Sequence, residues 1–455
     1  MIMERIKRIL EIFQDTIKNI ESLSDFYNRS DQTLVIYKQE LENEYVYARN
    51  INDALNALFD IDSYKERNKK LKVINRIIID DKNKLSDVCE VVPFEKDNQN
   101  FISYSMNNEL LDIEKYDPNN AVKIIEQIKQ YEYILDESVL SHIVVSFENF
   151  LSNIYRYLIC NNPNMYLAGQ TVLLTDLLQN NFPETFAEKI ENEVTSKMYD
   201  SLSTLKMISE KEKISVEKYK NTISSFAEIY YRRNAYVHTS GRANKDYLDK
   251  VDKSFSKNLK IDDKLFCDKD YLIKSIYTLN QLIFAITFEL LAKENASSNA
   301  IMVLGNYYFD KLKKGDYELT KYVYKEMSKY KGITFADRLM YRINYIISVK
   351  HLGENKLVNR ELETLDVSAA EMQFKIAKEC LNENYEKVYN MLSESYPESF
   401  PAIAIRDWPI FIEFRETEYY KKFIELHQED FRIQQIEDSN LELDDLLVNE
   451  EKNIG

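Results

Sequence analysis

The chain has 455 residues, of which 44% are hydrophobic and 30% are charged, a balance typical of globular proteins that excludes a mainly disordered chain. Its seven glycines and seven prolines are too few for a sheet-rich fold with many turns, and neither a P-loop nor a Rossmann glycine motif occurs. A net charge of −16 argues against a general nucleic-acid-binding protein. We therefore predict an all-α protein of roughly two to four domains, with long helices joined by short polar connections.

Residues 1–137 are predicted to form an N-terminal helical region with an irregular insert. Apolar residues near its start recur at helical spacing: Ile6, Ile9, Phe13, Ile17 and Ile20. Many aliphatic residues between 55 and 79 do the same. Residues 80–116 are mixed and polar and contain Pro93, so we interpret them as a long connection. Asp117 and Pro118 suit the N-cap and the first residue of a further helix, which continues over residues 121–135.

Residues 138–296 are predicted to form a central helical bundle. One apolar stripe at helical spacing consists of Ile143, Phe147, Phe150, Leu151, Ile154 and Leu158. The last stripe of the bundle consists of Ile273, Ile276, Leu279, Ile283, Ile286 and Leu290. Residues 173–178, 186–207 and 216–237 predict further helices between the two. Amphipathic helices at this spacing are typical of a bundle that shares one core.

Residues 297–433 have a repetitive pattern. Gly315, Gly353 and Glu383 each lie between two predicted helices, and they are 38 and 30 residues apart, an average of 34. Because this is the period of tetratricopeptide-type helix pairs, the region resembles a degenerate array of such repeats, without their consensus Trp and Pro positions. Such an array implies a concave surface for a protein partner or trigger. The alternative is an ordinary helical domain with coincidental spacing. Residues 434–455 form an acidic tail.

Positive charge is concentrated in one part of this acidic chain. Residues 206–260 contain 13 basic and 7 acidic side chains, whereas residues 437–451 contain seven acids and no base. A local basic region fits an anion-binding site, and a solvated helical face is the alternative.

The most informative segment is residues 226–241, with the sequence FAEIYYRRNAYVHTSG. Its apolar positions predict one buried helical face, and Thr239, Ser240 and Gly241 are expected to end the helix, with Gly241 in the left-handed conformation. His238 is therefore expected near a helix C-terminus, where the helix dipole favours a protonated imidazole.

Arg233, Asn234 and His238, in the order Arg-Asn-x-x-x-His, resemble the signature of the HEPN superfamily of ribonucleases. The opening helix with Phe147 and Glu148, the Ser-Gly after the motif and the apolar closing helix are also similar to that family, over residues 138–296. The resemblance implies an HEPN-like bundle, metal-independent endoribonuclease activity on RNA, and a homodimer with a composite cleft. It further implies a toxin or anti-phage defence effector that acts by abortive infection.

The chemistry suits these residue types. Cleavage of RNA by its own 2′-hydroxyl needs an acid or base that titrates near neutral pH, which His238 provides, and a fixed cation to hold the phosphate, which Arg233 provides. Asn234 lies four residues before His238 and shares its helix face, so it is expected to orient the imidazole or contact the phosphate. Arg232, Arg242 and Lys245 are expected to bind RNA nearby.

The spacing of Arg233 and His238 raises a geometric problem. Five residues correspond to about 140° of rotation on a regular helix, so the two side chains would not point together. Either the helix loosens before His238 or a second subunit completes the site. Purely structural roles are the alternative for each residue: Arg232 and Arg233 would pair with acids, and His238 would cap its helix.

No cofactor and no metal site are expected. The cysteines, Cys89, Cys160, Cys267 and Cys380, are dispersed, and no pair of histidines has the spacing of a zinc protease. The longest apolar run, residues 282–288, is far shorter than the roughly 20 residues that span a bilayer, so we expect no membrane association and a cytoplasmic location.

Two classes of function remain open from the sequence. The first is the endoribonuclease described above. The second is a non-catalytic scaffold or adaptor in which the helical repeats bind a protein partner. HEPN toxins paired with nucleotidyltransferase antitoxins usually have a tyrosine two residues beyond the histidine, and Ser240 stands there in this chain. This departure weakens the expectation of regulation by modification at that position.

Overall fold

The computed structural model describes residues 2–59, 89–96, 99–106, 118–171, 182–214 and 217–431, together with the single residues 66, 69 and 174. Four predictions fall outside the described residues: the part of the aliphatic pattern of residues 55–79 that follows residue 59, the cap at Asp117, the short helix at residues 173–178 apart from residue 174, and the acidic tail, residues 434–455.

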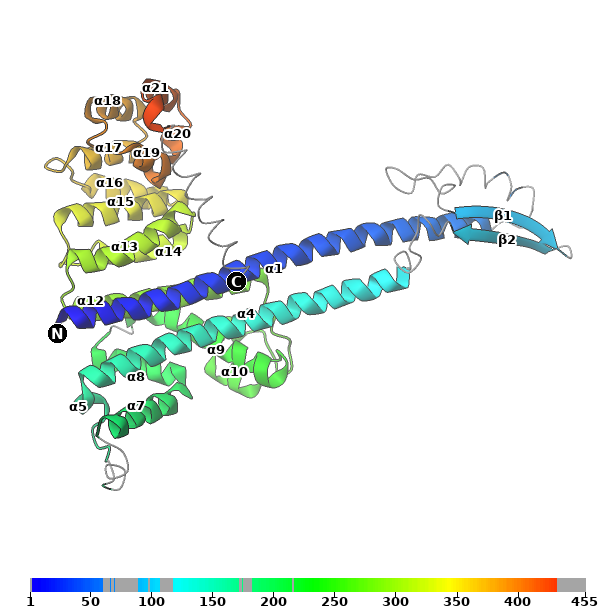
Figure 1. The fold of residues 1–455 in the computed structure, drawn as a ribbon, viewed down its shortest axis with the longest axis horizontal. Coiled ribbons are helices and arrows are strands. Elements are labelled where there is room, and N and C mark those ends of the chain that lie inside the picture. The colour runs from blue at the N-terminus through cyan, green and yellow to red at the C-terminus, as the bar shows by residue number, and fades with distance from the viewer. Residues whose placement is uncertain are drawn as a thin grey trace, which may run out of the picture. The chain divides into compact units, whose positions relative to one another are not determined.

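The prediction of an all-α protein is confirmed. Figure 1 shows helices throughout the described chain and a single β-hairpin. The helices before the repetitive region are α1 (Ile2–Phe59), α4 (Pro118–Asn161), α5 (Pro163–Tyr166), α7 (Phe182–Met198), α8 (Ser201–Glu212), α9 (Lys220–Thr239), α10 (Lys245–Lys250), α11 (Lys253–Ser256) and α12 (Lys269–Lys293).

The hairpin corrects one prediction. Strands β1 (Cys89–Lys96) and β2 (Gln99–Met106) pair in antiparallel register, within the segment that we interpreted as an irregular connection. Pro93 argued against a strand, yet each strand of a two-stranded ribbon is an edge, where a missing amide donor is tolerated. Phe94 and Phe101 face each other across the strands with ring centroids 5.4 Å apart, a cross-strand pair that stabilises the ribbon.

Helix α4 differs from the prediction in length. We expected separate helices over residues 121–135 and from residue 143. The structure has one continuous helix through this point. Residues 136–142 contain neither glycine nor proline, and Val139 and Leu140 are buried there, so the apolar stripe continues without interruption.

The chain divides into two compact units. Unit 1 comprises Met1–Ile17, Phe147–Ala227 and Ile276–Gly455, and unit 2 comprises Lys18–Ser146 and Glu228–Ser275. Helices α1, α4, α9 and α12 contribute residues to both units. The predicted motif residues Arg233, Asn234 and His238 therefore belong to unit 2, and the repetitive region belongs to unit 1.

Unit 1 is built around the apolar stripes predicted for α4 and α12. Phe147 and Phe150 are fully buried, and the Phe147 ring meets the Phe226 ring edge to face at 4.6 Å between centroids. On α12, Leu279 and Ile283 are fully buried. By length and composition, α12 is the one helix in the described ranges that could cross a bilayer, but 67% of its most apolar window is buried inside the protein, as expected of a core helix.

The repetitive region of unit 1 consists of successive helix pairs, stacked as Figure 1 shows. The helices are α13 (Ser298–Lys313), α14 (Tyr317–Met327), α15 (Phe335–His351), α16 (Asn355–Thr364), α17 (Met372–Leu381), α18 (Tyr385–Ser395), α19 (Ala402–Asp407), α20 (Ile412–Arg415) and α21 (Glu418–Leu426). The three turns predicted from the sequence lie between α13 and α14, between α15 and α16, and between α17 and α18.

These three turns share one backbone structure. Gly315, Gly353 and Glu383 all adopt the left-handed conformation, with φ of +82°, +74° and +62°. In each turn the following amide donates to the carbonyl five residues earlier, at 3.0 Å after Gly315, 3.2 Å after Gly353 and 3.0 Å after Glu383. This bond satisfies a carbonyl that would otherwise be left without a partner at the helix end. The recurrence of one turn explains why the sequence pattern repeats.

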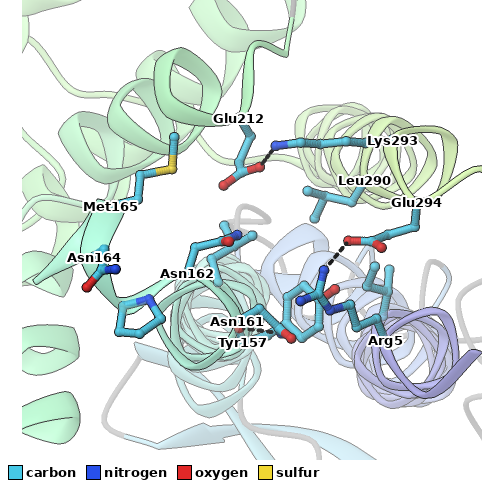
Figure 2. Close-up of a pocket in the computed structure, with 13 residues that line it drawn as sticks. Arg5, Tyr157, Asn161, Asn162, Asn164, Met165, Glu212, Leu290, Lys293 and Glu294 are labelled. Carbon is cyan, nitrogen blue, oxygen red and sulfur yellow. Dashed lines mark hydrogen bonds and ion pairs between the residues drawn. The ribbon is translucent and has the colours of Figure 1, made fainter. Parts of the chain in front are cut away.

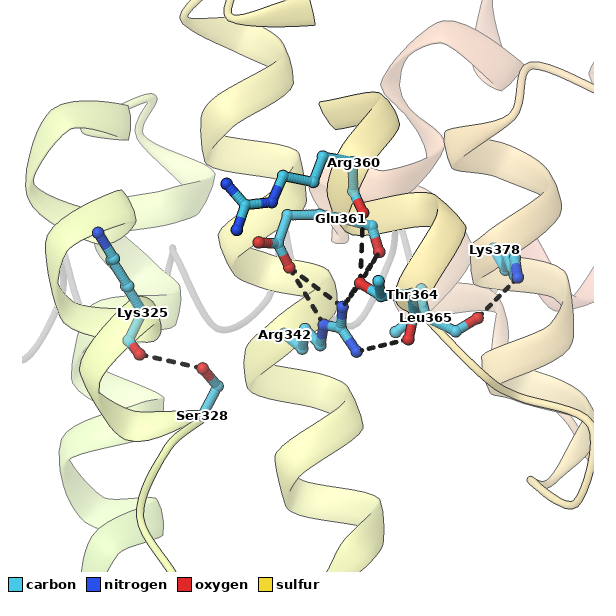
Figure 3. Close-up of polar contacts among 8 residues, drawn as sticks. All are labelled: Lys325, Ser328, Arg342, Arg360, Glu361, Thr364, Leu365 and Lys378. Atoms are coloured by element: carbon cyan, nitrogen blue, oxygen red, sulfur yellow. Dashed lines mark hydrogen bonds and ion pairs between the residues drawn. The ribbon is translucent and has the colours of Figure 1, made fainter. Parts of the chain in front are cut away.

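Arg342 ties two of these helices together (Figure 3). From α15, its guanidinium donates to the Thr364 carbonyl at 2.9 Å and the Glu361 carbonyl at 3.1 Å, both at the end of α16. It also forms an ion pair with the Glu361 carboxylate at 3.1 Å. A cation that satisfies the last carbonyls of a helix complements the helix dipole there.

The repeated turn makes a prediction about stability. Gly353→Ala should destabilise the protein by about 1 kcal/mol, because a side chain disfavours the left-handed conformation, while no atom lies within 4 Å of the added Cβ. Glu383→Gly should be neutral or stabilising for the same backbone reason. Urea unfolding of both variants and the wild type measures the difference. Equal losses in both variants would contradict the shared turn.

A second prediction concerns the pairing of α1 with α4 in unit 2. The Tyr27 hydroxyl donates to the Asp136 carboxylate at 2.9 Å. Burial raises the pKa of Asp136 to about 6, although the Tyr27 hydrogen bond lowers it and the Asp31 charge raises it. The folded protein therefore holds this proton to a higher pH than the unfolded chain, whose aspartate pKa is near 4.

The stabilisation from this proton is complete below about pH 4 and is lost as the pH rises through about 6. Asp136→Asn lacks this dependence, so the Tm of this variant should rise relative to that of the wild type as the pH is raised from 4 to 7. Tyr27→Phe removes the hydrogen bond that lowers the pKa of Asp136, so in this variant the loss of stability should occur at a higher pH than in the wild type. Thermal unfolding across this range measures both effects, and parallel pH profiles for Asp136→Asn and the wild type would contradict the prediction.

Candidate functional site

The predicted motif lies at the C-terminal end of α9, as the sequence indicated. The helix remains regular to Thr239, and Ser240 and Gly241 follow with φ of +51° and +72°. The Gly241 amide donates to the Ala235 carbonyl at 3.1 Å, which closes the helix end. A Cβ at Gly241 would lie 2.8 Å from both the Tyr133 hydroxyl and a ring carbon of Tyr236, so only glycine fits.

Arg233, Asn234 and His238 are not brought together within the chain. Helix α9 does not loosen before His238, so Arg233 and His238 stay about 140° apart around its axis. The Arg233 guanidinium lies 5.4 Å from the Tyr230 ring centroid, and Arg233 and Asn234 are half-buried. The His238 side chain is exposed, and we find no hydrogen bond from it to any residue in the described ranges. Its imidazole is therefore open to an incoming ligand.

Arg232, predicted to contact RNA, lies instead in a buried polar cluster. Its Nε donates to the Glu228 carboxylate at 2.7 Å, and its guanidinium lies over the Tyr271 ring, 4.2 Å from the centroid. The Tyr247 hydroxyl donates to the same Glu228 oxygen at 2.6 Å, and the Tyr271 hydroxyl donates to the other at 2.7 Å. Burial and the nearby Glu228 charge raise the pKa of Tyr271, so its hydroxyl stays protonated and donates.

This cluster fixes α9 to α10 and α12 within unit 2. The Glu228 side chain is only 2% exposed, and a buried carboxylate is tolerated because its charge is paired and both of its oxygens accept hydrogen bonds. Sequence reasoning missed Glu228, Tyr247 and Tyr271. The available signal was the spacing of four residues between Glu228 and Arg232, which suits an ion pair on one helix.

The other two predicted RNA contacts are accessible. Arg242 is exposed, and its guanidinium donates to the Asp262 carbonyl at 2.9 Å. Lys245 is exposed at the first position of α10, after Asn244, whose side chain caps that helix by accepting from the Tyr247 amide at 2.9 Å. These two cations remain available to a phosphate.

Unit 1 contains a separate polar pocket of about 630 Å³ (Figure 2). Its charged side chains are paired with one another: Lys293 with Glu212, and Arg5 with Glu294 at 3.5 Å. The Tyr166 hydroxyl also donates to Glu212 at 2.5 Å. Because each cation in this pocket has an acidic partner, the lining presents no excess positive charge to an anion.

Within the described ranges, no group of three or more His, Cys, Asp and Glu side chains is placed to hold a metal ion. Comparison of the chain with protein-family models, with curated proteins and with solved structures finds no match. The site is therefore defined by its own residues alone.

The buried cluster makes a prediction. Glu228→Gln removes the charge that balances Arg232, whose side chain is only 14% exposed, and should destabilise the protein by about 3 kcal/mol. Glu191→Gln is the matched control, because Glu191 pairs with Arg156 at 2.6 Å on the surface, and it should cost less than about 1 kcal/mol. Urea unfolding compares the two variants. A loss in Glu228→Gln no larger than that in the control would contradict the role of this ion pair.

Proposed function

We propose that the protein is a metal-independent endoribonuclease of the HEPN type. The observation that carries the proposal is the exposed imidazole of His238 at the end of α9, five residues after Arg233 and within a basic stretch of an acidic chain. An exposed histidine at a helix C-terminus is placed to exchange protons with a substrate.

In the proposed reaction, the 2′-oxygen of the RNA forms a bond to the adjacent phosphorus while the bond from phosphorus to the 5′-oxygen breaks. One group removes the proton of the 2′-hydroxyl and another protonates the leaving oxygen, and His238 serves one of these roles. Arg233 stabilises the negative charge on the phosphoryl oxygens. The products are a 2′,3′-cyclic phosphate and a free 5′-hydroxyl, so no water is consumed in this step.

Because Arg233 and His238 point to different sides of one helix, we propose that two copies of the chain form the site together. A twofold dimer through the central bundle would place Arg233 of one protomer beside His238 of the other. Asn234, on the face of His238, would orient the imidazole. Arg242 and Lys245 would contact neighbouring phosphates of the RNA.

We assign the repetitive region of unit 1 to the recognition of a protein partner or trigger, as a tetratricopeptide-like array. The three helix pairs with one repeated turn support this assignment. A nuclease that cleaves cellular RNA has to be held inactive until it is triggered, so a cytoplasmic toxin or anti-phage defence effector fits this arrangement. The same helix pairs support the second candidate function, a non-catalytic adaptor.

The proposed nuclease is tested by incubating labelled single-stranded RNA with purified protein in EDTA. His238→Ala and Arg233→Ala should each lower the cleavage rate by about 100-fold or more, because each removes a group that acts in the transition state. His142→Ala and Arg360→Ala, at exposed positions on other helices, are the matched controls and should cleave as the wild type does. The products should carry cyclic phosphate ends. Equal cleavage by the wild type and all four variants would overturn the assignment. A wild type that cleaves no RNA but binds a protein through its helix pairs would favour the second candidate function, the non-catalytic adaptor.

Mixing the two inactive variants tests the composite site. In a mixed dimer of Arg233→Ala and His238→Ala, one of the two sites would contain both native residues, so an equimolar mixture should recover about a quarter of the wild-type activity. No recovery after subunit exchange would mean that the site is not shared in this way.

A further inference from the structure

Unit 2 also contains a pocket, of about 310 Å³, whose lining includes a residue of α9, the helix that carries the motif. Its lining includes Arg232, Phe255, Lys257, Asn258, Lys264 and Phe266, and we name it the Phe266 pocket. The volume is at the lower end of the range for ligand sites, which suits one nucleobase or one phosphate group rather than a larger molecule. Sequence reasoning named only Arg232 among these residues.

The pocket is positively charged. Three cationic side chains and no acidic one contribute to its lining. Glu228 beneath Arg232 balances that charge, so the excess positive charge is carried by Lys257 and Lys264, both exposed. The nearby Asp263 carboxylate is engaged by the Lys260 amide at 2.7 Å. In a chain with a net charge of −16, a concave surface of this kind is suited to an anion.

Two aromatic rings lie among these cations. Phe266 is 68% exposed and Phe255 is 41% exposed, although burial of such rings is favourable. Exposed aromatic rings beside lysines are the combination by which proteins bind single-stranded nucleic acid, because the rings stack on bases and the ammonium groups attract phosphates. Asn258 adds an amide that can form hydrogen bonds with a base edge.

The pocket is held rigidly against the motif helix. The Ala243 amide donates to the Asp263 carbonyl and the Leu265 amide to the Gly241 carbonyl, each at 2.8 Å, so the segment that carries Lys264 and Phe266 is bonded to the turn after α9. Tyr236 of α9 donates its hydroxyl to the Leu265 carbonyl at 2.5 Å. Arg232 donates to the Phe266 carbonyl as well. Little ordering is therefore needed when a ligand binds.

From this combination we propose that the Phe266 pocket binds one nucleotide of single-stranded RNA, with its base stacked on Phe266 and its phosphates on Lys257 and Lys264. This inference rests on the proposed function for the identity of the ligand as substrate. Arg232 of the pocket and Arg233 of the proposed cleavage site are consecutive residues of α9, so the same turn of this helix contributes to both. Their side chains point about 100° apart around the helix axis, so the pocket is a binding site separate from the proposed cleavage site.

The test measures binding separately from cleavage. Fluorescence anisotropy of a labelled 12-nucleotide oligouridylate is followed in EDTA with His238→Ala as the parent protein. Adding Phe266→Ala should weaken binding by roughly 5- to 100-fold, the range for loss of one stacked base, and Phe266→Trp should retain it. Adding Lys257→Gln and Lys264→Gln together should lower the slope of log affinity against log salt concentration by about 1.4.

Controls at equivalent surface positions separate the pocket from general effects. Phe182→Ala removes a phenylalanine that is also 68% exposed, and Lys331→Gln with Lys356→Gln removes two exposed lysines of unit 1. These variants should bind RNA as the parent does, and circular dichroism should show that all of the variants are folded. Binding by Phe266→Ala that equals the parent, equal losses in the controls, or no binding by the parent would each overturn the inference.

The two proposals can fail independently. If the wild type cleaves no RNA but binding depends on Phe266 and the two lysines, the pocket stands and the ribonuclease assignment fails. If the wild type cleaves RNA and the pocket variants bind and cleave as it does, only the pocket inference fails.

Discussion

The arrangement of unit 2 around the motif depends on one buried carboxylate. Glu228 is almost completely removed from solvent, and a charge in that position is tolerated because Arg232, Tyr247 and Tyr271 each donate a hydrogen bond to it, and the bond from Arg232 is also an ion pair. These partners come from α9, α10 and α12, so the interaction fixes the rotation of the motif helix relative to its neighbours. The directions in which Arg233 and His238 point follow from that rotation.

Some of this structure could be predicted from the sequence because local physical rules dominate. The stripe from Ile143 to Leu158 is buried because apolar residues at helical spacing have to share a core. The end of α9 at Ser240 and Gly241 follows from the need for left-handed residues after a helix. The turns at Gly315 and Gly353 follow the same rule. Glu383 was recognised because it too lies between two predicted helices, although its residue type disfavours the left-handed conformation.

Other features depend on contacts between residues that are distant in the sequence, so local sequence patterns could not predict them. Helix α4 is continuous, with Val139 and Leu140 buried, whereas we expected one helix to end at residue 135 and another to begin near residue 143. The two tyrosine partners of Glu228, Tyr247 and Tyr271, are 19 and 43 residues away, and no spacing rule connects them to it. The Phe266 pocket combines side chains from α9, from α11 and from the segment before α12, so its charge was visible in the sequence only as a diffuse excess of lysines. Of the three residues that the sequence predicted to bind RNA, Arg232, Arg242 and Lys245, Arg232 is the one whose side chain is instead paired with a buried carboxylate.

Tyr133 of α4 contacts both the segment that follows His238 and the Phe266 pocket. Its hydroxyl donates to the Ser240 carbonyl at 3.4 Å, its ring lies 5.7 Å from the Tyr236 ring, and the Lys264 ammonium lies 4.8 Å from its ring centroid. One side chain on a long helix is thus packed against the segment that follows His238 and against a lysine of the Phe266 pocket. Because the hydroxyl and the ring belong to one side chain, both contacts depend on the position of a single residue of α4.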